Sequence, residues 1–244
     1  MNALDALAIT AAGFTAGGVN TIVGSGSLIT FPTLLALGYP SVTANVSNTV
    51  GLVFGGVSSV VGYRAELEGQ RRRAIRLACG TSAGALAGGI LLLELPSSVF
   101  DAVVPVLILL ACALMAIRRT PAAHAHHEHT AAGTAAAFGT GIYGGYFGAA
   151  QGIILMSLLR FCFPDDLQRI NGLKNVLAAV ANGVAAILFV LVADVRWGPA
   201  ALIAIGSIAG AQLAARYGRR IPSNVLRWTV VVAGTIVAII LIAT

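Results

Sequence analysis

The sequence predicts an all-α protein that crosses a membrane several times, and three observations lead to this fold class. Of the 244 residues, 57% are hydrophobic and 10% are charged, and the mean hydropathy is +0.89. Average soluble domains carry about 25% charged residues. Apolar stretches of about 20 residues, long enough to cross a bilayer as a helix, recur along the chain. Two further apolar stretches are longer and contain glycine-rich interruptions. We therefore expect a polytopic membrane protein.

Six apolar stretches have the length of one transmembrane helix. They are Thr43–Tyr63, Ala74–Leu93, Ser97–Ile117, Ile170–Ala193, Trp197–Ala215 and Val225–Ala243. Leu4–Leu37 and Ala131–Phe163 are each too long for one crossing. Non-helical backbone at membrane depth persists only where it is buried in protein or lines a polar cavity. Glycines interrupt the first long stretch at Gly24-Ser25-Gly26-Ser27 and the second from Gly144-Gly145 through Gly152. We predict a hairpin at each break, continuing as half-helices over Ser27–Leu37 and Gly152–Phe161.

The positive charges predict the topology. All Lys and Arg residues except Arg196 lie in or beside four loops, near residues 64–76, 118–119, 160–174 and 216–227. The positive-inside rule places these loops in the cytoplasm. Loops 118–130 and 160–169 then lie on one side, so the stretch between them must enter the membrane and return. Leu4–Leu37 ends outside and, if it is built in the same way, also begins outside.

This reasoning predicts two inverted-topology repeats, each a glycine-broken helical hairpin plus three transmembrane helices. The first repeat covers residues 1–119, a cytoplasmic linker covers 120–130, and the second repeat covers 131–244. Faint sequence similarity supports a duplication. Gly17-Gly18 corresponds to Gly144-Gly145, Pro40 to Pro164 and Asn48 to Asn175, in the same order and at offsets of about 124 to 127 residues.

The predicted breaks form the candidate site. A helix N-terminus exposes unpaired N–H groups and about half a positive charge, which suits an oxyanion. Polar residues inside a membrane are costly and usually face the interior of the bundle. The candidate substrate-binding residues are Gly24, Ser25, Gly26, Ser27, Asn45, Asn48, Thr49, Gly148, Gln151, Gly152, Asn171, Lys174 and Asn175. Each has a structural alternative, which is helix capping or close packing for the serines and interhelical hydrogen bonding for the asparagines.

Helical spacing places two polar sets on two helix faces. Asn45, Asn48 and Thr49 share one face in the first half, and Asn171, Lys174 and Asn175 share one in the second. Lys174 is the sharpest candidate, because a cation within the bundle can balance a bound anion. The alternative is that its side chain reaches the cytoplasmic interface, since Arg169 is only a few residues away.

The glycine-rich motifs resemble those of the TauE/SafE family. The first runs through Gly17-Gly18, Gly24-Ser25-Gly26-Ser27 and Phe31-Pro32, and is followed by the run from Thr43 to Thr49. The second runs from Gly141 through Gly148 to Gly152, with Ala149, Ala150 and Gln151 departing from the fuller glycine pattern. The resemblance covers nearly the whole chain. It implies a membrane permease that exports sulfite, sulfoacetate or related sulfur oxyanions and organosulfonates.

We therefore expect a secondary transporter or facilitator that exports a small sulfur-containing anion by alternating access across a bacterial inner membrane. An anion channel and a non-transporting scaffold remain the alternatives. An enzyme is not expected, because a serine nucleophile needs a base and every histidine lies at 124–129. No Walker-type run is present.

We expect no cofactor and no metal. The partners are the anion, the lipid bilayer and, as one open arrangement, a second copy of the chain. The net charge of +6 is interpreted as a signal that orients the chain in the membrane, and no nucleic-acid partner is expected. The cluster His124, His126, His127 and His129 is interpreted as a soluble linker, the alternative being a metal-binding or pH-sensing role.

Overall fold

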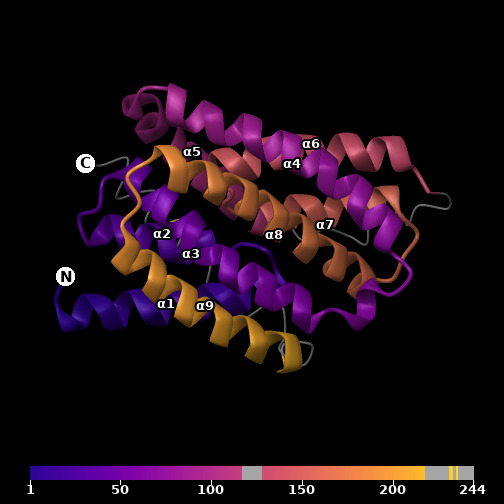
Figure 1. Ribbon diagram of the computed structural model, residues 1–244, viewed down its shortest axis with the longest axis horizontal. Coiled ribbons are helices and arrows are strands. Elements are labelled where there is room, and N and C mark those ends of the chain that lie inside the picture. Colours follow the sequence, from indigo (N-terminus) through magenta and orange to yellow (C-terminus); the bar gives the residue numbers. More distant parts are fainter. Residues whose placement is uncertain (117–127, 218–230, 233–234, 236–244) are drawn as a thin grey trace.

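A computed structural model describes residues 1–116, 128–217, 231–232 and 235, and the regular elements within these ranges are all helical (Figure 1). The α-helices are α1 (Ala3–Ile22), α2 (Ser27–Ala36), α3 (Ser41–Gly62), α4 (Arg71–Glu94), α5 (Ser97–Ala116), α6 (Thr130–Tyr146), α7 (Gln151–Cys162), α8 (Leu167–Val192) and α9 (Trp197–Tyr217). A short 3-10 helix, η1 (Ala65–Leu67), precedes α4. The predicted all-α class is confirmed.

Four of the described helices, α3, α4, α8 and α9, are long and apolar enough to cross a membrane. They match four of the predicted spans to within a few residues. Helix α5 begins at Ser97, as predicted, and is described as far as Ala116. The last predicted span lies almost entirely outside the described residues, as do most of the linker 120–130 and the histidines at 124, 126 and 127. The chain is thus a multi-pass membrane protein.

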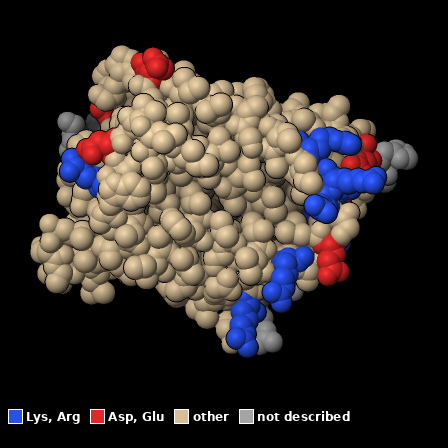
Figure 2. All heavy atoms as spheres, in the orientation of Figure 1, with Lys and Arg blue, Asp and Glu red and all other residues tan. Residues whose placement is uncertain are grey.

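The surface is divided into an apolar middle and charged ends. On the face drawn in Figure 2, Lys, Arg, Asp and Glu lie at the upper left and along the right and lower right margins, and the broad region between them carries other residues. Large apolar side chains such as Leu191 (76% exposed) and Ile187 (66% exposed) lie open on the surface. Such exposure is costly in water but favourable against acyl chains, so this region suits the hydrocarbon layer.

The two halves of the chain interleave. Helix α1 packs mainly against α9, and α6 packs mainly against α4, so each broken segment lies against a helix from the other half. Helices α3 and α8 lie between these two pairs (Figure 1). Glycines permit the close approach. A Cβ at Gly17 would lie 2.2 Å from the Ser207 carbonyl oxygen, and one at Gly145 would lie 2.1 Å from that of Ala85.

The loops gather at two ends in the grouping that the charges predicted. At one end, Arg73 at the start of α4 contacts Asp165 before α8 and Glu128 before α6. At the other end, Ser41 at the start of α3 hydrogen-bonds Asp101 of α5. The apolar stretch Ala131–Phe163 therefore begins and ends at the same end of the molecule, as a hairpin does.

Both breaks exist, and both predicted half-helices are confirmed as α2 and α7. The first break follows Ile22, and Gly24 has a φ of +88° that favours glycine. The second covers residues 147–150, with Gly148 at +74° and Ala150 at +58°. The prediction that this break begins at Gly144-Gly145 is wrong. Both glycines are helical within α6 and serve close packing instead.

Candidate transport site

The two breaks meet inside the protein. The N–H of Gly152 donates to the carbonyl oxygen of Gly24 over 2.9 Å, although 128 positions separate them in the chain. The backbones touch so closely that a Cβ on Gly152 would lie 2.4 Å from the Gly24 Cα, and the reverse distance is also 2.4 Å. Ser25, Ala149 and Ala150 beside the contact are at most 1% exposed. The site is therefore surrounded by protein.

The start of α2 carries no side-chain cap. Its N-cap is Gly26, which forms no side-chain capping bond, and the hydroxyl of Ser25 has no hydrogen-bond partner. The capping alternative for Ser25 and Ser27 is therefore wrong in this conformation. The N–H of Gly26 instead donates to Oδ1 of Asn20 over 3.4 Å. A buried, unpaired hydroxyl is costly, so its retention beside a helix N-terminus suits a site that receives a ligand.

The start of α7 is closed by the protein itself. The N–H of Gln151 donates to the Gly148 carbonyl, and that of Gly152 to Gly24. The Gln151 side chain turns back toward α6, where Nε2 donates to the Thr140 carbonyl oxygen over 3.1 Å. Gln151 and Gly152 thus shape the crossing point, and their donors are occupied in this conformation.

Lys174 lies in the interior and contacts the end of α1. The residue is 0% exposed, so the alternative that it reaches the interface is wrong. Its Nζ donates to the carbonyl oxygens of Asn20 over 3.0 Å and Thr21 over 3.3 Å. These carbonyls belong to the last turn of a helix, where unpaired C=O groups carry negative partial charge. The lysine therefore stabilises the end of α1 created by the break.

Two asparagines accompany Lys174, as their spacing predicted. Nδ2 of Asn171 and Nδ2 of Asn175 each lie 3.3 Å from the Thr21 carbonyl oxygen. All three donors on this face of α8 thus converge on one helix end. The oxygen of the Asn171 side-chain amide, Oδ1, is buried without a partner.

The polar face of α3 contacts the other broken segment. Nδ2 of Asn45 donates to the Tyr146 carbonyl oxygen at the end of α6 over 3.0 Å. Oδ1 of Asn48 accepts from Thr30 of α2, while its Nδ2 is buried and unpartnered. Thr49 instead bonds the Asn45 carbonyl of its own helix over 2.9 Å. Asn45 therefore donates to the C-terminal end of α6, just as Asn171 donates to the C-terminal end of α1. The hydroxyl of Thr49 already has a hydrogen-bond partner in its own helix.

Unsatisfied polar atoms gather around the breaks. In the described part of the chain, the buried atoms without a partner include the Ser25 hydroxyl, Asn48 Nδ2, Asn45 Oδ1 and Asn171 Oδ1. The hydroxyl and Nδ2 are donors suited to an oxyanion, and the two amide oxygens suit an O–H group or water.

Several contributors escaped the sequence analysis. Thr30 orients Asn48, and Asn20 supplies both a carbonyl to Lys174 and a side-chain oxygen to Gly26. Phe147, in the second break, packs edge-on against Phe31 of α2 with ring centroids 5.2 Å apart. The sequence offered one indication for Asn20, because its polar amide lies close to the first break. An aromatic contact between distant segments has no local signature.

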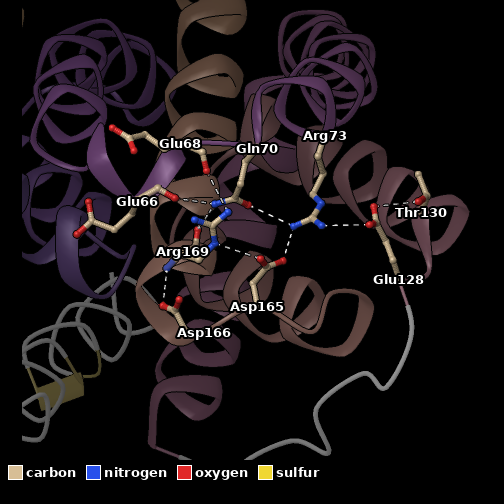
Figure 3. Close-up of polar contacts among 9 residues, drawn as sticks. All are labelled: Glu66, Glu68, Gln70, Arg73, Glu128, Thr130, Asp165, Asp166 and Arg169. Atoms are coloured by element: carbon tan, nitrogen blue, oxygen red, sulfur yellow. Dashed lines mark hydrogen bonds and ion pairs between the residues drawn. The ribbon is translucent and has the colours of Figure 1, made fainter.

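An ion-pair network covers the end of the molecule that carries Arg73, and Figure 3 shows that guanidinium between Glu128 and Asp165. Arg169 of α8 pairs with Asp165 over 3.2 Å and donates to the Glu68 carbonyl oxygen over 3.1 Å. The bond from Arg73 lowers the pKa of the Glu128 carboxyl below its usual value. The network ties α4 and its preceding loop to α8, near the polar face of Lys174.

Comparison with known proteins is consistent with this architecture. The family model described as "Sulfite exporter TauE/SafE" matches residues 9–241. A probable membrane transporter protein, ORF9, of Sinorhizobium sp is 24% identical over 95% of this chain and 90% of its own length. The probable membrane transporter protein YfcA of Escherichia coli K12 is 23% identical over 82% of this chain and 76% of its own. No solved structure matches. The chain belongs to the TauE/SafE family of membrane transporters.

Proposed function

We propose that the protein exports a small sulfur-containing anion by alternating access across a bacterial inner membrane. Sulfite, thiosulfate, sulfoacetate and other organosulfonates are the candidate substrates. The sulfur specificity rests on the family description, and the bacterial membrane on the sources of the curated relatives. The inference that the substrate is a small anion rests on the geometry and the polar groups of the site.

The contact between Gly24 and Gly152 carries the proposal. Two interrupted helices meet within protein, which is the arrangement by which transporters bind ions and charged substrates near the middle of a bilayer. The donors Ser25 Oγ and Asn48 Nδ2 are buried without partners. An oxyanion offers them acceptors, so its binding would relieve the cost of their desolvation.

Lys174 supports an anionic substrate through the charge balance of the interior. A buried ammonium is expensive unless it is paired, and here it donates to two neutral carbonyl groups. When Lys174 is protonated, the interior carries a positive charge that these contacts only partly compensate. An arriving monoanion would neutralise it, which favours anions over cations of the same size.

We infer that the moving bodies are two helix bundles rather than the two halves of the sequence. Helix α9 packs on α1 and α3, whereas α4 packs on α6 and α8. If the halves are inverted repeats, α4 and α9 are equivalent helices that have exchanged places. Rocking between the bundles α1–α3–α9 and α4–α6–α8 would open the breaks to either side in turn, and separation of Gly24 from Gly152 is the expected step.

Export needs no further energy source under this proposal. An inside-negative potential drives an anion outward with about 2.3 kcal/mol per charge per 100 mV.

The test is flux through the purified protein in liposomes. Vesicles loaded with sulfite, thiosulfate, sulfoacetate or sulfate are diluted into anion-free buffer, and efflux is followed under an imposed potential. We expect saturable, protein-dependent efflux of one or more sulfur anions. Non-saturating conductance would favour a channel, and absence of flux for every anion in correctly folded protein would favour a scaffold.

A further inference from the structure

A basic groove separate from the transport site lies where α3 and α9 end. The cavity, of about 660 Å³, is lined by residues that include Val61, Arg64, Leu213, Arg216 and Tyr217. Its floor is narrow because a Cβ on Gly62 would lie only 2.3 Å from Cβ of Ala215. The groove therefore sits directly over the close approach of these two membrane-spanning helices.

The groove is apolar toward the middle of the membrane and basic toward its surface. In each segment an exposed aliphatic residue precedes an arginine by three positions. Leu213 precedes Arg216 within α9, and Val61 of α3 precedes Arg64, which lies just beyond the end of that helix. Val61 and Leu213 are each 50% exposed. At 1.5 Å per residue along α9, Leu213 and Arg216 are separated by about 4.5 Å along the helix axis. This order matches a phospholipid, with acyl chains below a headgroup.

Both arginines are available to a phosphate. Neither Arg64 nor Arg216 forms an ion pair with a carboxylate in the described ranges, whereas Arg73 and Arg169 do. The guanidinium of Arg216 lies 5.6 Å from the ring centre of Tyr217, which is 46% exposed. Tyrosine at a helix end is typical of the membrane–water interface. Two guanidinium groups above an apolar floor complement a negative headgroup.

We propose that this groove binds one anionic phospholipid, such as phosphatidylglycerol, at the end of the molecule that carries the arginine-rich loops. The phosphate contacts Arg64 and Arg216, and the acyl chains cover Val61 and Leu213. The lipid then bridges α3 and α9, which come from different halves of the chain. The groove lies outside the residues assigned to the transported anion.

The test measures lipid retained by the purified full chain. Native mass spectrometry in detergent compares phosphatidylglycerol with phosphatidylcholine of the same acyl chains, and glycerol 3-phosphate serves as a headgroup without chains. We expect selective binding of phosphatidylglycerol and none of glycerol 3-phosphate. Equal binding of both lipids, or binding of glycerol 3-phosphate alone, would overturn the proposal.

Variants locate the binding. The double variant Arg64→Gln/Arg216→Gln is expected to lose roughly fivefold in affinity for each arginine removed. Arg64→Lys/Arg216→Lys should retain most of the binding. The matched control Arg71→Gln/Arg72→Gln removes two exposed arginines outside the groove, and it should bind as the wild type does. Equal losses in the glutamine pair and in this control would show general attraction to basic loops, and so reject the groove. Size-exclusion profiles and helical circular dichroism establish that each variant is folded.

Discussion

The Gly152 N–H donates to the Gly24 carbonyl oxygen over 2.9 Å, joining the two broken segments at one point. At each break a backbone group lacks its partner within the helix, and this contact pairs the two groups. It leaves no space for a side chain on either segment. It also occupies a donor at the start of α7 that a substrate would otherwise meet. Opening of this contact is therefore the structural event that the proposed transport cycle requires.

Substitution of Gly152 by alanine tests the contact directly. The added Cβ would lie 2.4 Å from the backbone of Gly24, which cannot move aside as a flexible side chain can. We expect Gly152→Ala to cost about 1–3 kcal/mol, the usual range for overpacking, and to abolish anion efflux. Gly26→Ala should act similarly, because its Cβ would lie 2.5 Å from the Ala16 carbonyl oxygen. Thermal unfolding and liposome flux are the measurements.

Gly183→Ala is the matched control, since a Cβ there meets nothing within 4 Å and the residue is also helical. It should leave both flux and melting temperature close to those of the wild type. Full activity of Gly152→Ala would contradict the crossing of the two breaks.

Lys174→Met separates the structural role of the ammonium from its role in transport. Methionine fills similar volume and removes a buried charge, an exchange that is often neutral for stability. Asn171 and Asn175 still donate to the Thr21 carbonyl, so the end of α1 keeps two partners. We expect a folded protein whose anion efflux falls by at least about tenfold, the effect of 1.4 kcal/mol. Lys174→Ala should also lower flux, and wild-type flux in both variants would remove Lys174 from the proposed mechanism.

Asn48→Ala tests the unpartnered donor of α3. The substitution removes Nδ2, the candidate ligand group, and also removes the bond from Thr30. Thr30→Val breaks the same bond but keeps Nδ2, so it reports the structural part alone. We expect Asn48→Ala to raise the KM for the anion several-fold more than Thr30→Val does, as concentration-dependent efflux would reveal. Equal effects of the two substitutions would assign Asn48 to packing.

Features that depend on local sequence were the ones that could be predicted. The half-helices α2 and α7 follow from long apolar stretches broken by glycine, and the shared face of Asn171, Lys174 and Asn175 follows from helical periodicity. The grouping of loops at two ends followed from the arginines. Predicting these properties requires only a few neighbouring residues or the sign of a charge.

Features that depend on tertiary packing could not be predicted. Gly144 and Gly145 were assigned to the break because glycine weakens helices, but glycine also permits close contact. Only the tertiary neighbours decide between these roles, which are the Gln151 side chain for Gly144 and Ala85 of α4 for Gly145. Lys174 was predicted as a cation within the bundle that balances a bound anion, and the contact that it makes with the C-terminal carbonyls of α1, about 150 positions away, was not foreseen. No local pattern encodes the partner that a buried donor finds at such separation.

Arg73→Gln tests the ion-pair network at the arginine-rich end. It removes contacts to Asp165 and Glu128 and the stacking of the guanidinium 4.5 Å from the Phe163 ring centre. The side chain is 19% exposed, so screening by water is incomplete. We expect a loss of about 1–2 kcal/mol at pH 7, measured by thermal unfolding. Arg71→Gln, an exposed neighbour on the same helix, should cost less than about 0.5 kcal/mol.

The Glu128 branch of this network predicts a dependence on pH. Because the bond from Arg73 lowers the pKa of Glu128 in the folded protein, the carboxylate stabilises the fold above its usual pKa of 4.5. That contribution is lost as the pH falls through the lower, folded-state pKa. The melting-temperature difference between wild type and Glu128→Gln should therefore be present at pH 7 and shrink below about pH 4.5. Glu94→Gln, at the opposite end of α4, is the control. A difference that stays constant down to pH 3 would exclude ionisation of Glu128 as the cause, because protonation removes the charge on which the bond depends.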